Sequence, residues 1–101
     1  MDCQVVWSPE AIEDLEEVAG YIARDSQQHA GAVANKILAS ARDVATFPRA
    51  GRVVPEVGEE DLRERFVYSY RLIYRIQQEA IMIVAVVHGR RLLDSLGERF
   101  Q

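Results

Sequence analysis

The chain has 101 residues, of which 49% are hydrophobic, and a formal net charge of −4. This composition predicts one globular domain over residues 1–101 and excludes intrinsic disorder, which requires far fewer aliphatic residues. A pI of about 5.1 argues against indiscriminate nucleic-acid binding. The single cysteine cannot form an internal disulfide, and neither a metal site nor a cofactor is expected.

The terminal and hydrophobic patterns predict a cytoplasmic protein. Residues 1–4 lack the basic and apolar regions of a signal peptide. The longest apolar run, residues 80–87, is far shorter than the roughly 20 residues that cross a bilayer. We therefore expect no membrane association.

Residues 3–7 form a short β-prone segment, and a helix is predicted directly behind it. Ser8 is a favourable N-cap, and Pro9 suits the first helical position. Apolar residues at helical spacing predict the buried face of this helix: Ile12, Leu15, Val18, Ala19 and Ile22. The acidic residues are expected to form a solvated face on the other side: Glu13, Asp14, Glu16 and Glu17.

A polar break at residues 25–28 precedes a second predicted helix, from about His29 to Thr46. Pro48 ends this helix, because the residue before a proline avoids the α region. The two helices form an αα-hairpin. Residues 49–61 are predicted to be loop, since Gly and Pro recur along them.

From residue 62 the apolar pattern changes to a period of two and predicts strands over 62–68, 70–77 and 80–88. The last strand is apolar at nearly every position, so we expect it inside the sheet with both faces covered. Short connections favour an antiparallel meander. The predicted class is α+β with the order β-α-α-β-β-β, in which the helical hairpin packs on a small, mainly antiparallel sheet. A tail with weak helical spacing follows, at Leu92, Leu93, Leu96 and Phe100.

Positive charge is concentrated on the predicted strands. Residues 62–91 carry six Arg and two Glu, whereas residues 1–61 carry five basic and twelve acidic residues. Arg71 and Arg75 fall on one strand face, where they could contact a partner or pair with nearby Glu side chains such as Glu64 and Glu79. Simple alternation also places three tyrosines on one face, where core packing is expected: Tyr68, Tyr70 and Tyr74.

Five short motifs occur in order along the chain: Ser8-Pro9-Glu10-Ala11, Phe47-Pro48-Arg49-Ala50-Gly51, Leu62-Arg63, Tyr70-Arg71-Leu72-Ile73-Tyr74-Arg75 and His88-Gly89-Arg90-Arg91. Together they span about residues 4–93 and resemble the ParE/RelE superfamily of bacterial type II toxins, closer to the ParE side. The resemblance implies a toxin that a cognate antitoxin holds inactive in a hetero-oligomer. In the RelE branch the activity is mRNA cleavage on the ribosome, and in the ParE branch it is poisoning of DNA gyrase.

An RNase of the RelE kind needs a base, an acid and cations that hold the phosphate. The resemblance assigns phosphate contacts to Arg71 and Arg91, and His88 could titrate near neutrality. The catalytic Tyr of some ribosome-dependent relatives has no counterpart, because residues 92–101 contain no Tyr or His, and Lys36 is the only lysine. No catalytic residue is therefore assigned.

The leading hypothesis is a ParE-like toxin that inhibits gyrase by protein binding. The alternatives are a ribosome-dependent mRNA endonuclease using Arg71, His88 and Arg91, and a stabilisation or interaction module without toxicity. Six residues are expected to contact the target or the antitoxin: Arg63, Arg71, Arg75, His88, Arg90 and Arg91. We expect the antitoxin to order a flexible segment along the helices and sheet, with acids opposite these arginines.

Overall fold

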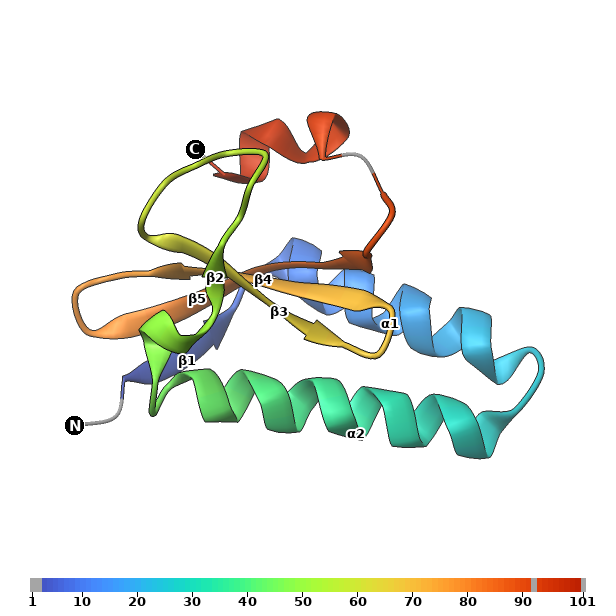
Figure 1. Cartoon of the computed structure of the whole chain (residues 1–101). Coiled ribbons are helices and arrows are strands. Elements are labelled where there is room, and N and C mark those ends of the chain that lie inside the picture. The colour runs from blue at the N-terminus through green and yellow to red at the C-terminus, as the bar shows by residue number, and fades with distance from the viewer. Residues whose placement is uncertain (1–2, 92, 101) are drawn as a thin grey trace.

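A computed structural model describes residues 3–91 and 93–100 (Figure 1). Its elements, in chain order, are β1 (Gln4–Trp7), α1 (Pro9–Ala23), α2 (Gln27–Val44), the 3-10 turn η1 (Pro48–Ala50), β2 (Arg52–Val53), β3 (Leu62–Val67), β4 (Tyr70–Ile76), β5 (Ala80–His88) and the 3-10 segment η2 (Asp94–Phe100). The described residues contain no helix that is long and apolar enough to cross a membrane.

The five strands form one sheet in the spatial order β1-β5-β4-β3-β2. β3, β4 and β5 make the predicted antiparallel meander, and β1 pairs with β5 in parallel. The α+β class and the β-α-α-β-β-β order are confirmed. One short strand is added, because β2 lies within the segment predicted to be loop and pairs with β3.

The first helix begins as predicted, but its buried face differs from the prediction. The Ser8 hydroxyl accepts from the Ala11 N–H at 3.1 Å and caps α1. Ile12 is 47% exposed, whereas Asp14 is buried at 6% exposure, so the expected solvated position of Asp14 is wrong. Asp14 is buried because it bonds a part of β5 that β1 does not reach. β1 pairs with β5 only as far as Ile83, and the Asp14 carboxylate accepts the N–H of Val86 further along β5.

The second helix spans Gln27–Val44, so the predicted bounds of His29 and Thr46 are both shifted. The Ser26 hydroxyl accepts from the His29 N–H at 3.1 Å, which starts the helix two residues earlier. The helix ends at Val44, in a tightened turn where the Ala45 N–H bonds the Arg42 carbonyl. This end lies before Pro48, which was predicted to end the helix.

The β3–β4 connection corrects the predicted strand ends. β3 stops at Val67, and Tyr68 lies in the turn with φ of 54°, the left-handed region. Tyr68 is therefore exposed and does not share the buried face of Tyr70 and Tyr74. β4 ends at Ile76, one residue before the predicted end.

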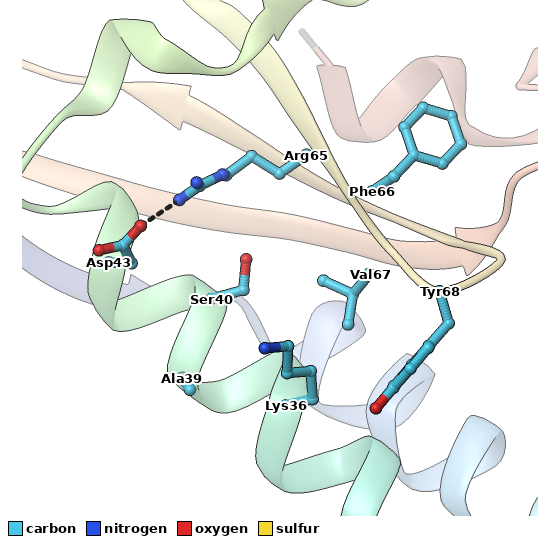
Figure 2. Close-up of a pocket in the computed structure, with 8 residues that line it drawn as sticks. All are labelled: Lys36, Ala39, Ser40, Asp43, Arg65, Phe66, Val67 and Tyr68. Atoms are coloured by element: carbon cyan, nitrogen blue, oxygen red, sulfur yellow. Dashed lines mark hydrogen bonds and ion pairs between the residues drawn. The ribbon is translucent and has the colours of Figure 1, made fainter.

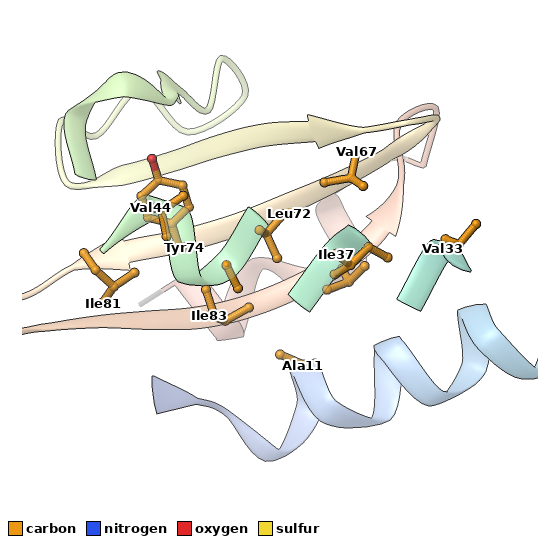
Figure 3. Packing of buried hydrophobic residues seen from close by; sticks show 11 residues of the cluster. Ala11, Val33, Ile37, Val44, Val67, Leu72, Tyr74, Ile81 and Ile83 are labelled. Carbon is orange, nitrogen blue, oxygen red and sulfur yellow. The ribbon is translucent and has the colours of Figure 1, made fainter. Parts of the chain in front are cut away.

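Apolar side chains fill both faces of the sheet. The larger cluster lies between the helices and the sheet, with Ile37, Leu72 and Ile83 near its centre (Figure 3). On the opposite face, the segment after β2 and residues 93–100 cover β5 with these side chains: Val54, Leu93, Leu96 and Phe100. The prediction that β5 is covered on both faces is confirmed, and the predicted tail helix is a 3-10 segment. Leu92, predicted for the tail, lies outside the described residues.

Candidate functional site

Arg71 is held inside the sheet by two carboxylates. Its side chain points away from the helices and is 4% exposed, and that of Glu64 on β3 is 0% exposed. The guanidinium donates Nε to Glu64 at 2.7 Å, and Nη1 and Nη2 to Glu56 at 2.7 and 2.8 Å. This clamp lowers the pKa of Glu56 from 4.5 to about 2, chiefly through the Arg71 hydrogen bonds, and the same bonds raise the pKa of Arg71. All three donor nitrogens of Arg71 are engaged inside the fold.

Arg63 and Arg75 fasten the segment between η1 and β3 onto the sheet. Arg63 donates to the carbonyls of Arg49 and Gly51 at 3.1 and 3.0 Å, and it binds the Glu60 carboxylate at 2.7 Å. Arg75 binds Glu59 at 3.0 Å and also donates to the carbonyl of Phe100. These contacts give both arginines a structural role, which the sequence left open for Arg75.

His88, Arg90 and Arg91 lie together where β5 ends. The His88 ring stands edge-on to Tyr70 with the centroids 5.8 Å apart, and His88 Nδ1 accepts the Arg90 N–H at 3.2 Å. Arg90 and Arg91 are exposed. Within residues 3–91 and 93–100, no carboxylate lies at ion-pair distance from either guanidinium.

The three residues of the RNase alternative do not form one cluster. Tyr70 pairs with His88 and Arg71 with Val87, so strand alternation turns the His88 and Arg71 side chains to opposite faces of the sheet. Arg71 faces η2 and the segment after β2, whereas His88 and Arg91 line a pocket against α1. The six predicted contact residues therefore divide into an internal set and an exposed set. Arg63, Arg71 and Arg75 form the first, and His88, Arg90 and Arg91 the second.

A groove between α2 and β3 is a site that the sequence did not reveal. It measures about 580 Å³, and we define the α2–β3 groove by the residues that line it: Lys36, Ala39, Ser40, Asp43, Arg65, Phe66, Val67 and Tyr68. Figure 2 shows Lys36 and Ser40 on α2 facing β3, and the ion pair of Arg65 with Asp43 at 2.6 Å closes one end. The residues come from distant segments, so only the packing of α2 beside β3 assembles the groove.

The sheet edge beside this groove is open. β2 pairs with β3 at Val53 with Arg63 and at Arg52 with Glu64. In the same register the next hydrogen-bonded pair after Arg52 with Glu64 would be Ala50 with Phe66, but Ala50 belongs to η1 and β2 ends at Arg52. Within the described residues, the Phe66 N–H and C=O have no backbone partner on the β2 side, and the Phe66 side chain is 54% exposed.

A second hollow, of about 390 Å³, lies at the end of the molecule where the two helices join. We define this end pocket by its lining: Tyr21, Ile22, His29, Val33, Tyr68, Ser69, Tyr70 and His88. An adjoining side pocket of about 340 Å³ shares Tyr21, Tyr70 and His88 and adds Asp14, Glu17 and Arg91, among others. Tyr21 was missed by the sequence analysis. No sequence signal marked it, because its place beside Asp14 in the side pocket depends on a burial of Asp14 that the α1 pattern does not indicate.

No group of three or more His, Cys, Asp or Glu side chains within residues 3–91 and 93–100 is placed to hold an ion. Two candidate partner surfaces are the open β3 edge with its groove and the Tyr- and His-lined end pocket, beside which Arg90 and Arg91 are exposed.

Comparison with known proteins gives one family match. The family model described as the ParE toxin of the type II toxin-antitoxin system, parDE, matches residues 5–93. A comparison with curated proteins finds no significant match.

Solved structures that share the fold include the following two. The chromosomal ParDE toxin–antitoxin system from P. aeruginosa aligns with a TM-score of 0.70 at 15% identity, over 85% of this chain and 95% of the other. The E. coli toxin RelE, as a double arginine-to-alanine mutant in the free state, aligns with a TM-score of 0.67 at 16% identity, over 99% of this chain and 92% of the other.

Proposed function

Because the chain belongs to the ParE toxin family of type II toxin–antitoxin systems, we propose that it inhibits DNA gyrase in the cytoplasm by binding the enzyme, and that a cognate antitoxin neutralises it. The observation that supports binding over bond cleavage is the burial of Arg71. This guanidinium is enclosed between Glu56 and Glu64. A side chain that is 4% exposed offers no free donor to a substrate phosphate.

The chemistry of RNA cleavage gives a second reason. Transfer of a proton from a 2′-hydroxyl and to the leaving oxygen needs positioned groups around one phosphate. Arg71 and His88 lie on opposite sheet faces, so they cannot contact the same phosphodiester without rearrangement. The likeness to RelE is one of fold and does not supply the missing acid and base.

The direct test is a gyrase assay with the purified chain. We expect it to block negative supercoiling of a relaxed plasmid or to trap cleaved DNA, and we expect addition of the cognate antitoxin to reverse the effect. Induction in cells should stop DNA synthesis before protein synthesis. The proposal fails if neither supercoiling nor DNA cleavage changes at a large molar excess of the chain over gyrase.

Other outcomes identify the alternatives. Immediate arrest of protein synthesis with codon-linked mRNA cuts would identify a ribosome-dependent endonuclease. Harmless induction without antitoxin would identify a stabilisation or interaction module. Each of these results contradicts gyrase inhibition, because DNA synthesis would not be the first process to stop. In the first case protein synthesis stops first, and in the second case no process stops.

We propose that the antitoxin occupies the α2–β3 groove with an extended segment. The unpaired N–H and C=O of Phe66 can bond an added strand, and the groove beside them accepts alternate side chains of that strand. Lys36 is exposed on the α2 wall and favours an acidic side chain in the segment. A segment of this kind orders on binding, as is typical of flexible partners.

The antitoxin proposal is tested by blocking the groove. Ala39→Arg places a long charged side chain in the groove, whereas Asn35→Arg places the same side chain at an exposed α2 position that does not line it. We expect Ala39→Arg to weaken antitoxin binding at least tenfold and Asn35→Arg to leave it unchanged in a calorimetric titration. Equal affinities for the two variants would reject the groove as the antitoxin site.

A further inference from the structure

We infer that the end pocket is the surface that contacts the target enzyme, and that it receives an aromatic or large aliphatic side chain flanked by acidic residues. This inference rests on the proposed function, because it assigns a surface to the proposed binding event. The expected partner is a protein segment, since the walls carry hydroxyls and imidazoles around an uncharged hollow.

Five segments of the chain converge to build this surface. The end of α1 supplies Tyr21, the start of α2 supplies His29, and the β3–β4 turn supplies Tyr68. The start of β4 and the end of β5 add Tyr70 and His88, whose rings are in edge-to-face contact. Figure 1 shows the α1–α2 connection and the β3–β4 turn at the same end of the molecule. Tyrosine combines a large apolar body with a polar tip, which is why it is enriched at protein interfaces.

Two of these aromatic side chains lie largely in solvent. Tyr21 is 70% and Tyr68 64% exposed, although both rings could bury a large apolar area. Tyr68 is also held at positive φ, which is uncommon for an aromatic residue. Strained backbone of this kind clusters at ligand contacts, and here it presents an aromatic ring to solvent.

The exposed arginines beside the end pocket indicate the charge of the segment that it binds. Each arginine between positions 49 and 75 has a carboxylate partner within the fold, whereas Arg90 and Arg91 have none among the described residues. Arg91 lines the side pocket that shares the Tyr21–Tyr70–His88 wall with the end pocket. These two exposed cations complement acidic groups, whereas the end pocket itself complements an apolar one. The side pocket also carries Glu17, opposite in sign to Arg91, which disfavours a uniformly anionic ligand such as a nucleic-acid backbone.

The position of Tyr68 explains how the antitoxin could block the target. Tyr68 lines both the α2–β3 groove and the end pocket. A segment that fills the groove therefore contacts a residue of the target surface, and the two partners compete for it. Tyr21 lines the end and side pockets but not the groove. A substitution of Tyr21 therefore tests target binding without changing the antitoxin groove.

The experiment compares two variants of this surface with two matched controls. Tyr21→Ala removes the exposed aromatic ring, and the double variant Arg90→Glu/Arg91→Glu reverses the unpaired charge. Phe47→Ala removes an aromatic ring of similar exposure, 64%, that lines neither pocket, and Arg42→Glu reverses an exposed charge on α2. Each variant is measured for gyrase inhibition, for binding to immobilised gyrase, for antitoxin affinity and for its denaturant midpoint.

We expect Tyr21→Ala and the charge-reversed variant each to lose at least tenfold in gyrase inhibition and in gyrase binding. The denaturant midpoint should stay unchanged in both, antitoxin affinity should stay unchanged for Tyr21→Ala, and both controls should match the wild type. If wild type inhibits gyrase and both surface variants do so equally well, the assignment of the surface is wrong and the proposed function stands. If wild type has no effect on gyrase and does not bind it, the proposed function fails and this inference fails with it.

Discussion

Arg71 and Glu64 face each other across neighbouring strands, with Arg71 Nε 2.7 Å from Glu64 Oε1 and both side chains almost completely removed from solvent. The second oxygen of Glu64 accepts from Arg52 on β2, and the remaining donors of Arg71 hold Glu56. Four charges therefore alternate in one network that ties β2, β3, β4 and the segment after β2 together. Burial of charge is tolerated here because each member has a partner of opposite sign.

Breaking the Arg71–Glu64 pair should destabilise the fold strongly. Glu64→Leu leaves Arg71 with a single carboxylate, and loss of one partner from a buried pair costs about 3–5 kcal/mol. The double variant Arg71→Met/Glu64→Leu should recover most of this loss, because water can solvate the half-exposed Glu56 and the exposed Arg52. Urea unfolding measures both effects. The exposed pair of Arg49 with Asp61 is the control, and Arg49→Ala should cost less than about 1 kcal/mol.

The same network predicts how stability depends on pH. The folded Glu56 carboxyl has a pKa of about 2, below its ordinary value of 4.5, chiefly because Arg71 binds it. In the unfolded chain Glu56 takes up its proton first as the pH falls, so its contribution to stability is complete above about pH 5 and is lost toward pH 2. Denaturant midpoints between pH 7 and pH 3 should fall less steeply for Glu56→Gln than for wild type.

The control for this pH series is Glu79→Gln. Glu79 is exposed and makes no ion pair with the described part of the chain. Its pH profile should parallel that of wild type. A Glu56→Gln profile that also parallels wild type would show that the Arg71 clamp does not carry the acid sensitivity.

The fold was largely predictable because its signals are local. Ser8 and Pro9 start α1, and the change to period two at residue 62 marks the meander. The parallel pairing of β1 with β5 was not predictable in the same way. It joins Gln4 to Ala80, and a four-residue strand carries no sequence signal for a partner so far along the chain.

The candidate site was less predictable, because side-chain pairing depends on where loops fold back. Glu56 lies in a segment without periodicity, and only its position over the sheet makes it a partner of Arg71. Helical periodicity also misassigned Asp14, since an acidic run is typical of a solvated face. Burial of Asp14 follows from an unpaired β5 N–H that no pattern in α1 could indicate.

Asp14 should be the most sensitive acidic position of α1. Its carboxylate accepts from the Val86 N–H at 3.0 Å and from Arg99 of η2 at 2.7 Å. Asp14→Ala leaves both donors without this acceptor and should cost about 1–3 kcal/mol. Asp14→Asn should cost less, because the amide oxygen can still accept from Val86. Hydrogen exchange should show faster exchange in residues 93–100 for Asp14→Ala, whereas Glu13→Ala, at an exposed neighbour, should match wild type.

The final prediction separates the structural role of Arg71 from a role in activity. The Arg71→Met/Glu64→Leu variant should keep the sheet packed, and it removes the arginine that the RNase alternative requires. Because the guanidinium is enclosed between Glu56 and Glu64, we expect this variant to inhibit gyrase within about threefold of wild type, a difference of less than about 1 kcal/mol. The measurement is supercoiling inhibition at matched concentrations of folded protein. A loss of inhibition with an unchanged denaturant midpoint would instead place Arg71 among the residues that act on the target.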